Sequence, residues 1–325
     1  MTFISYAQNF EDVMLWRALK HIEVGFYIDV GAADPTEGSV TRAFYDRGWN
    51  GINIEPEPLY AASLRTNRPR DINLELAVGA REGKAVIHRI AGTGLSTFDR
   101  EIAAGHEKAG HPSPQPTEIE VATIEGIWRR YDLNTVHFLK IDVEGAERDV
   151  ILGANLPKHR PWIIVVEATR PLSPQRNSSR FQKLVRDSGY RLRWFDGLNE
   201  WYIAEEHDNS LRVSFQAPPN VFDDFVFANH VNQAGRADAA ELQTEHVTSA
   251  LQRAEERFDL AQQQIEQSHS EFLAAEARAQ LAGEQLLKEQ RQVVELQREL
   301  DLMRSSKSWK MTASLRKWRS KITKL

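Results

Sequence analysis

Five acidic residues of this 325-residue chain stand where short apolar runs end, and they are the first candidates for chemistry: Asp29, Glu55, Asp142, Glu144 and Glu167. A carboxylate can accept hydrogen bonds from hydroxyl groups, take a proton as a general base, or bind Mg²⁺. Acidic residues also cap helices and interact with the helix dipole, which is the structural alternative for Glu144. The elements that carry these side chains decide between the roles.

The stretch Gly25 to Pro35, GFYIDVGAADP, has the order of a strand, a tight turn and a helix. Its apolar run is interrupted only by Asp29 and ends at Gly31, and a periodic segment follows from Ser39 to Arg47. At such a junction the backbone N–H groups of the helix start face a cleft, and small residues let a ligand approach the main chain. The stretch therefore predicts a nucleotide-type binding site.

Glu55 lies in a second short apolar stretch, GINIEP, 24 positions after Gly31. An acidic residue at the end of the strand that follows a glycine turn is placed to hold a ribose. One carboxylate can accept two hydrogen bonds from vicinal hydroxyl groups. We therefore expect Glu55 to bind a ribose, and a solvated strand end is the alternative.

Two further stretches repeat the pattern of a strand followed by an acidic turn. One is VHFLKIDVEGAE, from Val136 to Glu147, and the other runs from Ile163 to Glu167. Strands are also expected over 72–79 and 83–92, and Tyr190 to Ala204 has the pattern of a hairpin. Strands that alternate with helices at this spacing predict an α/β fold with a doubly wound parallel sheet, whose ligands bind at the carboxyl ends of the strands.

The segment from Thr93 to Thr117 is rich in Gly, Pro, Ser and His. We expect it to be a long loop, which in a compact domain is a functional lid or a disordered segment. Its His106 and His111 are expected to be surface residues, with substrate binding as the alternative.

Composition and motifs argue against several classes of protein. The chain has no cysteine, which excludes disulfide scaffolds and thiolate chemistry. No apolar run reaches the length of a spanning helix, about 18 residues, and no signal peptide is evident, so we expect a cytoplasmic protein. Residues 31–36, GAADPT, supply only the first glycine of a nicotinamide-binding motif. Nucleic-acid binding is not expected, because the globular part is acidic and no base-reading module is visible.

The C-terminal third follows a seven-residue repeat. Apolar residues recur every seven positions from Leu251 to Leu300, and a second series of mostly small residues runs from Val247 to Met303 and includes Glu289. Unbroken heptads predict a coiled coil over 244–303, after a globular domain over 1–230 and a linker over 231–243. A homo-oligomer is expected, with its number of chains open. A single long helix packed on another protein is the alternative.

Residues 304–325 form a basic tail, with eight basic residues and no acidic one in a chain of net charge −5. An apolar stripe at helical spacing lies opposite the basic face: Met311, Leu315, Trp318, Ile322 and Leu325. Such a helix can lie on an anionic membrane surface. The tail therefore predicts peripheral contact with the inner membrane, and a disordered tail or a helix that docks on a partner is the alternative.

Seven ordered motifs between about Ser5 and Phe227 resemble the FkbM family of S-adenosylmethionine-dependent methyltransferases: SYAQNFEDVML, YIDVGAADP, GWNGINIEPEP, FLKIDVEGAE, RPWIIVVEAT, DGLNEWYIA and PPNVFDDF. The resemblance implies a Rossmann-like, seven-stranded methyltransferase sheet with an antiparallel hairpin at one edge. It also implies methylation of hydroxyl groups, often on sugars and glycan precursors.

The resemblance also implies which residues bind S-adenosylmethionine. Its methionine part would meet Asp29, Gly31 and Ala32, with Asp34 in the same turn. Glu55 would hold the ribose, and Ala77 and Val78 the adenine. Asp34 and Pro35 stand where many methyltransferases have another glycine, which is a departure from the family pattern in this turn.

Methyl transfer to a hydroxyl group requires alignment of donor and acceptor and removal of a proton. Asp142 is the expected base or the holder of a metal-bound acceptor, and Glu144 is the second candidate. Asp142 and Glu167 together would bind Mg²⁺, although a protein base alone can suffice. Lys140 is expected to be a structural or orienting group.

We therefore expect a methyltransferase that acts on a hydroxyl group of a sugar or glycan. The tail pattern SxSWKxTxxLR is similar to tails of bacterial enzymes of surface polysaccharide assembly, which suggests that pathway. The alternative is a scaffold: a cofactor-binding domain with little or no activity, whose coiled coil spaces assembly enzymes at the membrane.

Overall fold

The computed structural model describes residues 2–171, 173–314 and 316, without the side chains of 232–246 and 250. The chain divides into two compact units, Met1–Arg236 and Ala237–Leu325. The first unit contains the sheets, and the second consists of most of one long helix and the residues after it.

A seven-stranded sheet forms the centre of the first unit. Five neighbouring strands are parallel, and the hairpin at one edge pairs antiparallel with them. In spatial order the strands are β12 (Tyr190–Phe195), β13 (Asn199–Ala204), β9 (Ile163–Glu167), β8 (Phe138–Ile141), β2 (Phe26–Val30), β3 (Asn50–Ile54) and β4 (Ile72–Leu74). This arrangement confirms the predicted α/β fold and the predicted hairpin.

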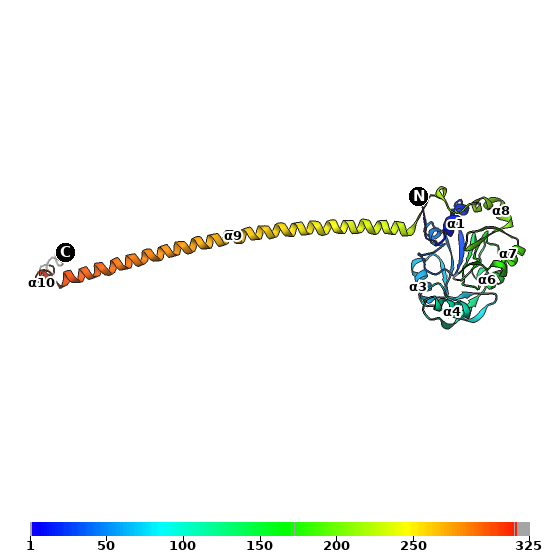
Figure 1. Ribbon diagram of the computed structural model, residues 1–325, viewed down its shortest axis with the longest axis horizontal. Coiled ribbons are helices and arrows are strands. Elements are labelled where there is room, and N and C mark those ends of the chain that lie inside the picture. The colour runs from blue at the N-terminus through cyan, green and yellow to red at the C-terminus, as the bar shows by residue number, and fades with distance from the viewer. Residues whose placement is uncertain (1, 172, 315, 317–325) are drawn as a thin grey trace. The chain divides into compact units, whose positions relative to one another are not determined.

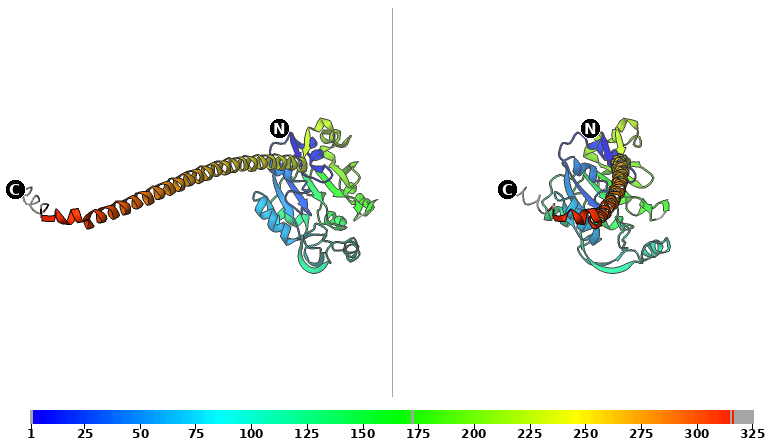
Figure 2. Two further views of the ribbon diagram at one scale, coloured as in Figure 1. Left: turned by 60° about the vertical axis from the view of Figure 1, so that its left-hand side comes forward. Right: turned by 90° about the vertical axis from the view of Figure 1, so that its left-hand side faces the viewer.

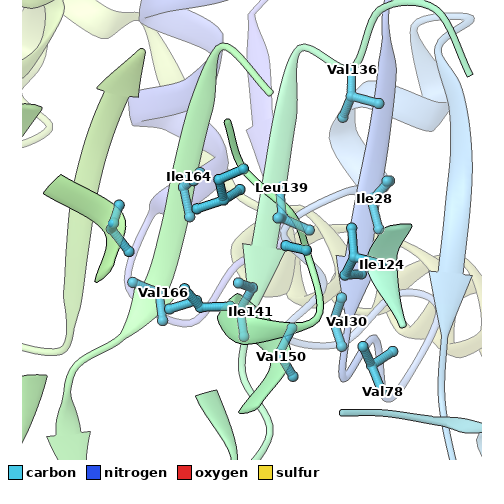
Figure 3. Packing of buried hydrophobic residues seen from close by; sticks show 14 of the residues in the cluster. Ile28, Val30, Val78, Ile124, Val136, Leu139, Ile141, Val150, Ile164 and Val166 are labelled. Atoms are coloured by element: carbon cyan, nitrogen blue, oxygen red, sulfur yellow. The ribbon is translucent and has the colours of Figure 1, made fainter. Parts of the chain in front are cut away.

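Helices cover both faces of this sheet (Figure 1). On one face, strand residues such as Ile28 and Val30 pack with α5 (Ile124–Arg130), α6 (Glu147–Leu152) and α7 (Gln182–Asp187). Figure 3 shows this face, where side chains of β2, β8 and β9 meet Ile124 and Val150. The opposite face, which includes Tyr27, packs with α1 (Glu11–Leu19), α2 (Arg42–Asp46) and α8 (Glu205–Leu211). Both faces are apolar because successive strand residues point to opposite sides of a buried sheet.

A small three-stranded sheet and one helix differ from the sequence predictions. The sheet consists of β5 (Ala77–Val78), β7 (Gln115–Ala122) and β6 (Gly83–Arg89). The single strand predicted over 72–79 is therefore two strands in different sheets. The loop predicted over 93–117 is also wrong, because it contains α4 (Arg100–Lys108), which Asp99 caps through the N–H groups of Glu101 and Ile102. Its last residues begin β7.

The remaining elements of the first unit join its ends and cover its edges. β1 (Phe3–Ser5) pairs in parallel with β14 (Phe225–Phe227), so the first and last family motifs lie side by side. α3 (Pro58–Asn67) follows β3, and β10 (Thr169–Arg170) pairs with β11 (Ser173–Arg176). The described residues of this unit also form three short 3₁₀ helices: Ser178–Arg180, Arg212–Phe215 and Val221–Asp223.

α9 (Ala228–Ser305) is one continuous helix of 78 residues (Figure 2). It includes residues 231–243, which we expected to be a linker, and it has no proline to interrupt it. Within the tail, α10 (Lys307–Met311) is described, whereas Leu315, Trp318, Ile322 and Leu325 lie outside the described residues. No helix in the described part of the chain is both long and apolar enough to cross a membrane.

Candidate active site

The carboxyl ends of β2, β3 and β8 surround a narrow cleft with a cavity volume of about 30 Å³, inside a partly open hollow of about 430 Å³. Five of the residues singled out in the sequence line it: Gly31, Glu55, Ala77, Val78 and Asp142. Apolar and small side chains form the rest of the lining, chiefly Ile54, Leu76, Ile87, Phe98 and Val143. The cleft therefore lies where ligands bind in a doubly wound sheet.

Gly31 allows the main chain of β2 and the end of β8 to meet. Its φ of +77° is in the left-handed region, and an added Cβ would lie 1.8 Å from the carbonyl oxygen of Asp142. The N–H groups of Gly31 and Ala32 both donate to the carbonyl of Ile54, at 2.9 and 3.2 Å. No other residue type fits this position, because both the conformation and the space exclude a side chain.

Glu55 is anchored through both carboxylate oxygens. Oε2 accepts the N–H of Ala33 and Oε1 accepts the N–H of Glu57, each at 2.8 Å. Burial raises the pKa of Glu55 to about 7, and the two N–H groups, which lower this pKa, offset only part of the rise. Each oxygen keeps a second lone pair, so the fixed carboxyl group can still accept a hydrogen bond from a ligand in the cleft.

Lys140 connects three groups beneath the cleft. Its Nζ donates to the carbonyl of Gly31 at 3.0 Å, and it lies 3.3 Å from Asp142 Oδ2 and 3.6 Å from Asp29 Oδ1. Burial alone would lower the pKa of Lys140, but Asp142 and Asp29 hold it above its ordinary value. The ammonium group is therefore charged and holds Asp142 in place at the end of β8.

Asp29 lies under the cleft and does not line it. Its side chain is 1% exposed and accepts a hydrogen bond from Thr41 Oγ1 at 3.0 Å. Burial raises the pKa of Asp29, and Lys140 and Thr41 partly offset this rise. Asp29 thus contacts Lys140, which holds Asp142, and Thr41, which precedes α2.

Several carboxyl groups gather beside Asp142. Burial, Asp142 and Glu147 raise the pKa of Glu144 to about 8. Burial and Asp142 also raise the pKa of Glu167, which lies within hydrogen-bonding reach of Asp142. At neutral pH, Glu144 and Glu167 are therefore mostly protonated and can donate a hydrogen bond. In the described part of the chain, no three His, Asp or Glu side chains form a group that could hold a metal ion, so the predicted Mg²⁺ site of Asp142 and Glu167 has no support.

Four other predicted residues do not line the cleft: Ala32, Asp34, Glu144 and Glu167. Asp34 Oδ1 accepts the N–H groups of Thr36 and Glu37, each at 2.8 Å, and this side chain lines a separate hollow with Tyr6 and Gln8. Ala32 is buried. Asp34 thus shapes the turn after Gly31.

We expected His106 to be a surface residue, and this prediction is wrong. Its side chain is fully buried. Nε2 lies 3.7 Å from Glu144 Oε2, and neither ring nitrogen has a hydrogen-bond partner among the described residues. Burial, and secondarily His111, lowers the pKa of His106, so the ring is neutral at pH 7. The helical spacing of Ile102, Ala103 and His106 was the available signal for this inward face.

Arg68 is a second buried residue that sequence reasoning missed. Its guanidinium group donates to the carbonyl of Pro35 and to Ser39 Oγ, and it lies 3.6 Å from Asp71. It therefore holds the loop that follows the turn at Gly31. Nothing in the local sequence distinguishes Arg68 from an exposed residue at the end of a helix.

The sheet order, the turn at Gly31 and the acidic end of β3 define the class, which is a Rossmann-like α/β domain with a cleft at the carboxyl ends of its strands. Residues 29–192, about half of the chain, match the family described as the methyltransferase FkbM domain. The chain belongs to this family, as its motifs predicted, and its globular unit is a methyltransferase domain.

Among solved structures, the chain is similar to CalO1, described as a methyltransferase in calicheamicin biosynthesis in its SAH-bound form. The match has 13% sequence identity and a TM-score of 0.28, and it covers 60% of this chain and 53% of CalO1. The chain thus matches about half the length of that protein. No curated protein gives a significant match.

Proposed function

We propose that this protein is an S-adenosylmethionine-dependent O-methyltransferase that acts on a hydroxyl group of a sugar or glycan. The observation that carries the proposal is the cleft in which Gly31, Glu55 and Asp142 meet, within a domain of the FkbM family. The three residues offer a main chain without a side chain at Gly31, an anchored carboxyl group for hydroxyls at Glu55, and the proposed base, Asp142.

The lining of the cleft fits the parts of S-adenosylmethionine. Glu55 would hold the ribose, and the apolar wall beside Ala77 and Val78, with Leu76 and Phe98, would hold the adenine. The methionine part would pass the main chain at Gly31, which lines the cleft and has no side chain. Bound S-adenosylmethionine supplies an activated methyl group.

Asp142 is the proposed base for the acceptor hydroxyl. It lines the cleft, and Lys140 holds one of its oxygens at 3.3 Å, so its position is defined before the acceptor binds. Glu144 is mostly protonated at pH 7, because its pKa is about 8, and it is better suited to donate a hydrogen bond to the acceptor. Asp142 would take the hydroxyl proton as the oxygen bonds to the methyl carbon, and the bond between that carbon and the donor sulfur would break to release S-adenosylhomocysteine.

The carboxyl groups around Asp142 support an acceptor rich in hydroxyl groups. Glu144, Glu147 and Glu167 all lie near this residue. Carboxyl groups of either protonation state form hydrogen bonds with sugar hydroxyls. A sugar or glycan offers such hydroxyl groups, and the tail motif is the basis for proposing bacterial surface polysaccharide as its source.

Calorimetric titration of the full-length protein with S-adenosylhomocysteine tests the cofactor site. We expect micromolar binding that weakens at least tenfold in Glu55→Ala and stays unchanged in Glu75→Ala, whose carboxylate pairs with Arg65 on the surface. If the unaltered protein does not bind this ligand, the proposed cofactor is wrong.

Transfer of labelled methyl groups to a panel of glycans tests the reaction. Asp142→Asn is expected to bind S-adenosylhomocysteine and to lose at least 100-fold in transfer rate, since a positioned base contributes about 10²–10⁴. A scaffold protein would instead show no transfer in either form, although it would bind the ligand.

For the tail, we propose peripheral membrane contact, which rests on its basic and apolar pattern. Binding of the full-length protein to vesicles that contain anionic lipid should weaken as the salt concentration rises. Equal binding by a protein that ends at residue 303 would contradict this proposal.

A further inference from the structure

Two series of residues along α9 form the seam predicted for a coiled coil, and the structure leaves their large side chains exposed. The large series recurs every seven residues and comprises Leu251, Phe258, Ile265, Phe272, Ala279, Leu286, Val293 and Leu300. The small series consists mainly of Ala254, Ala261, Ser268, Ala275 and Ala282, with Glu289 in the same row. Phe258 and Phe272 are 69% and 64% exposed. Apolar side chains at this spacing require a partner helix.

A parallel pair of these helices would place unfavourable groups together. In parallel coiled coils each seam residue meets its own copy, so layers of two phenylalanines would alternate with layers of two alanines. Glu289 would meet Glu289 of the second copy inside the seam. At the flanks, Glu271 would meet Glu276 of the second copy, which is a second repulsive contact.

An antiparallel pair brings the large series of one chain onto the small series of the other. The alignment that places Phe272 opposite Ala275 of the second copy also pairs Ile265 with Ala282 and Leu286 with Ala261. Four of the eight layers then contain one large and one small side chain, which avoids layers of two phenylalanines. Glu289 faces Phe258 of the second copy instead of another carboxylate.

Charged residues beside the seam select this same alignment. Antiparallel helices juxtapose equivalent flanking positions, so Glu271 lies opposite Arg278 of the second copy, and symmetry makes this contact twice. His269 likewise lies opposite Glu276. A shift of one heptad in one direction would instead place Glu271 opposite Glu271 of the second copy, and a shift in the other direction would place Arg278 opposite Arg278 of the second copy. Both contacts join like charges. Among the described residues, Glu271 accepts a hydrogen bond from Gln267 and Arg278 donates one to the carbonyl of Ala274, both within α9.

We propose that α9 forms an antiparallel dimer with a second copy of this chain, with Phe272 opposite Ala275 at its centre. Residues 247 and 300 bound the paired segment, which is on the order of 80 Å long at 1.5 Å per residue. The inference does not depend on the proposed reaction, and its tests do not measure methyl transfer.

Disulfide cross-linking of the full-length chain tests the orientation, because the chain has no native cysteine. In the proposed register Leu251 lies opposite Leu296 of the second copy. Leu251→Cys and Leu296→Cys should therefore not form cross-linked dimers as single variants, whereas the double variant should. Efficient cross-linking of either single variant would show a parallel pair, and a monomer mass for the unaltered protein by light scattering would overturn the dimer.

Charge reversal tests the register. Glu271→Arg should weaken dimerisation roughly tenfold, because two attractive contacts with Arg278 become repulsive. The double variant Glu271→Arg with Arg278→Glu should recover the original dissociation constant. In a parallel pair Glu271→Arg would instead strengthen the dimer, since it would relieve the contact with Glu276. Equal helix content by circular dichroism shows that the variants remain folded.

Discussion

The ammonium nitrogen of Lys140 lies 3.3 Å from Asp142 Oδ2, and the same nitrogen donates to the carbonyl of Gly31. Lys140 of β8 therefore holds both Asp142, at the end of the same strand, and the turn at Gly31, at the end of β2. The two features that the proposed reaction needs are therefore positioned by one buried cation.

Replacing Lys140 with Met should destabilise the domain and slow methyl transfer. The change keeps the apolar stem but leaves the buried Asp29 carboxylate without its counter-ion, which costs about 3–5 kcal/mol. Urea unfolding measures this loss. Lys84→Met is the matched control, because Lys84 and Glu118 form an exposed pair that contributes about 0–1 kcal/mol. Equal losses in the two variants would contradict the role of Lys140.

Replacing Gly31 with Ala should abolish binding of S-adenosylhomocysteine. The added Cβ would lie 1.8 Å from the carbonyl oxygen of Asp142, so β2 and β8 would have to move apart. Gly38→Ala is the control, because Gly38 has a φ of +71° but no atom within 4 Å of an added Cβ. Both variants pay the conformational cost of about 1–2 kcal/mol, and only Gly31→Ala should lose the ligand in calorimetry.

Glu144 should make the stability of the domain depend on pH. Its folded-state pKa of about 8 exceeds the ordinary value of 4.5, so the folded state retains the proton. Glu144 therefore contributes a few kcal/mol to the free energy of unfolding below about pH 4.5, and this contribution is lost as the pH rises through 8. The melting temperature should therefore fall less over this range in Glu144→Gln than in the unaltered protein.

The exposed residue Glu118 provides the control for this pH dependence, and Glu118→Gln should leave the slope unchanged. Other buried carboxyl groups contribute in the same direction, including Glu11 and Glu55, whose pKa values are about 7. The expected result is therefore a shallower slope in Glu144→Gln. An unchanged slope would show that Glu144 is ionised in the folded protein at neutral pH.

Replacing Arg68 with Met should cost about 3–5 kcal/mol of unfolding free energy, because it leaves buried polar groups without their partner. These are the carbonyl of Pro35, Ser39 Oγ and the carboxylate of Asp71. Arg65→Met, which removes an exposed pair with Glu75, should change the free energy by at most about 1 kcal/mol. Equal urea midpoints would indicate that the loop after Gly31 does not depend on Arg68.

The amino-acid sequence alone determined the main elements of the large sheet and the family of the domain. The apolar runs around Asp29 and Asp142, the glycine at position 31 and the turn of the hairpin act over a few residues, so each is readable locally. The heptads of α9 are readable for the same reason. The strand β7 was missed, although the alternation of Thr117, Ile119 and Val121 was a usable signal.

Only the tertiary structure decided which acidic residues line the cleft and which lie beneath it. Asp29 and Asp142 follow the same local pattern, yet Asp29 is buried beside Thr41 and Asp142 is in the cleft. The burial of His106 against Glu144 and of Arg68 against Pro35 likewise depends on segments far apart in the chain. Such placements follow from how strands and helices pack together, and local sequence patterns contain no information about partners more than a hundred residues away, such as Gly31 and Lys140.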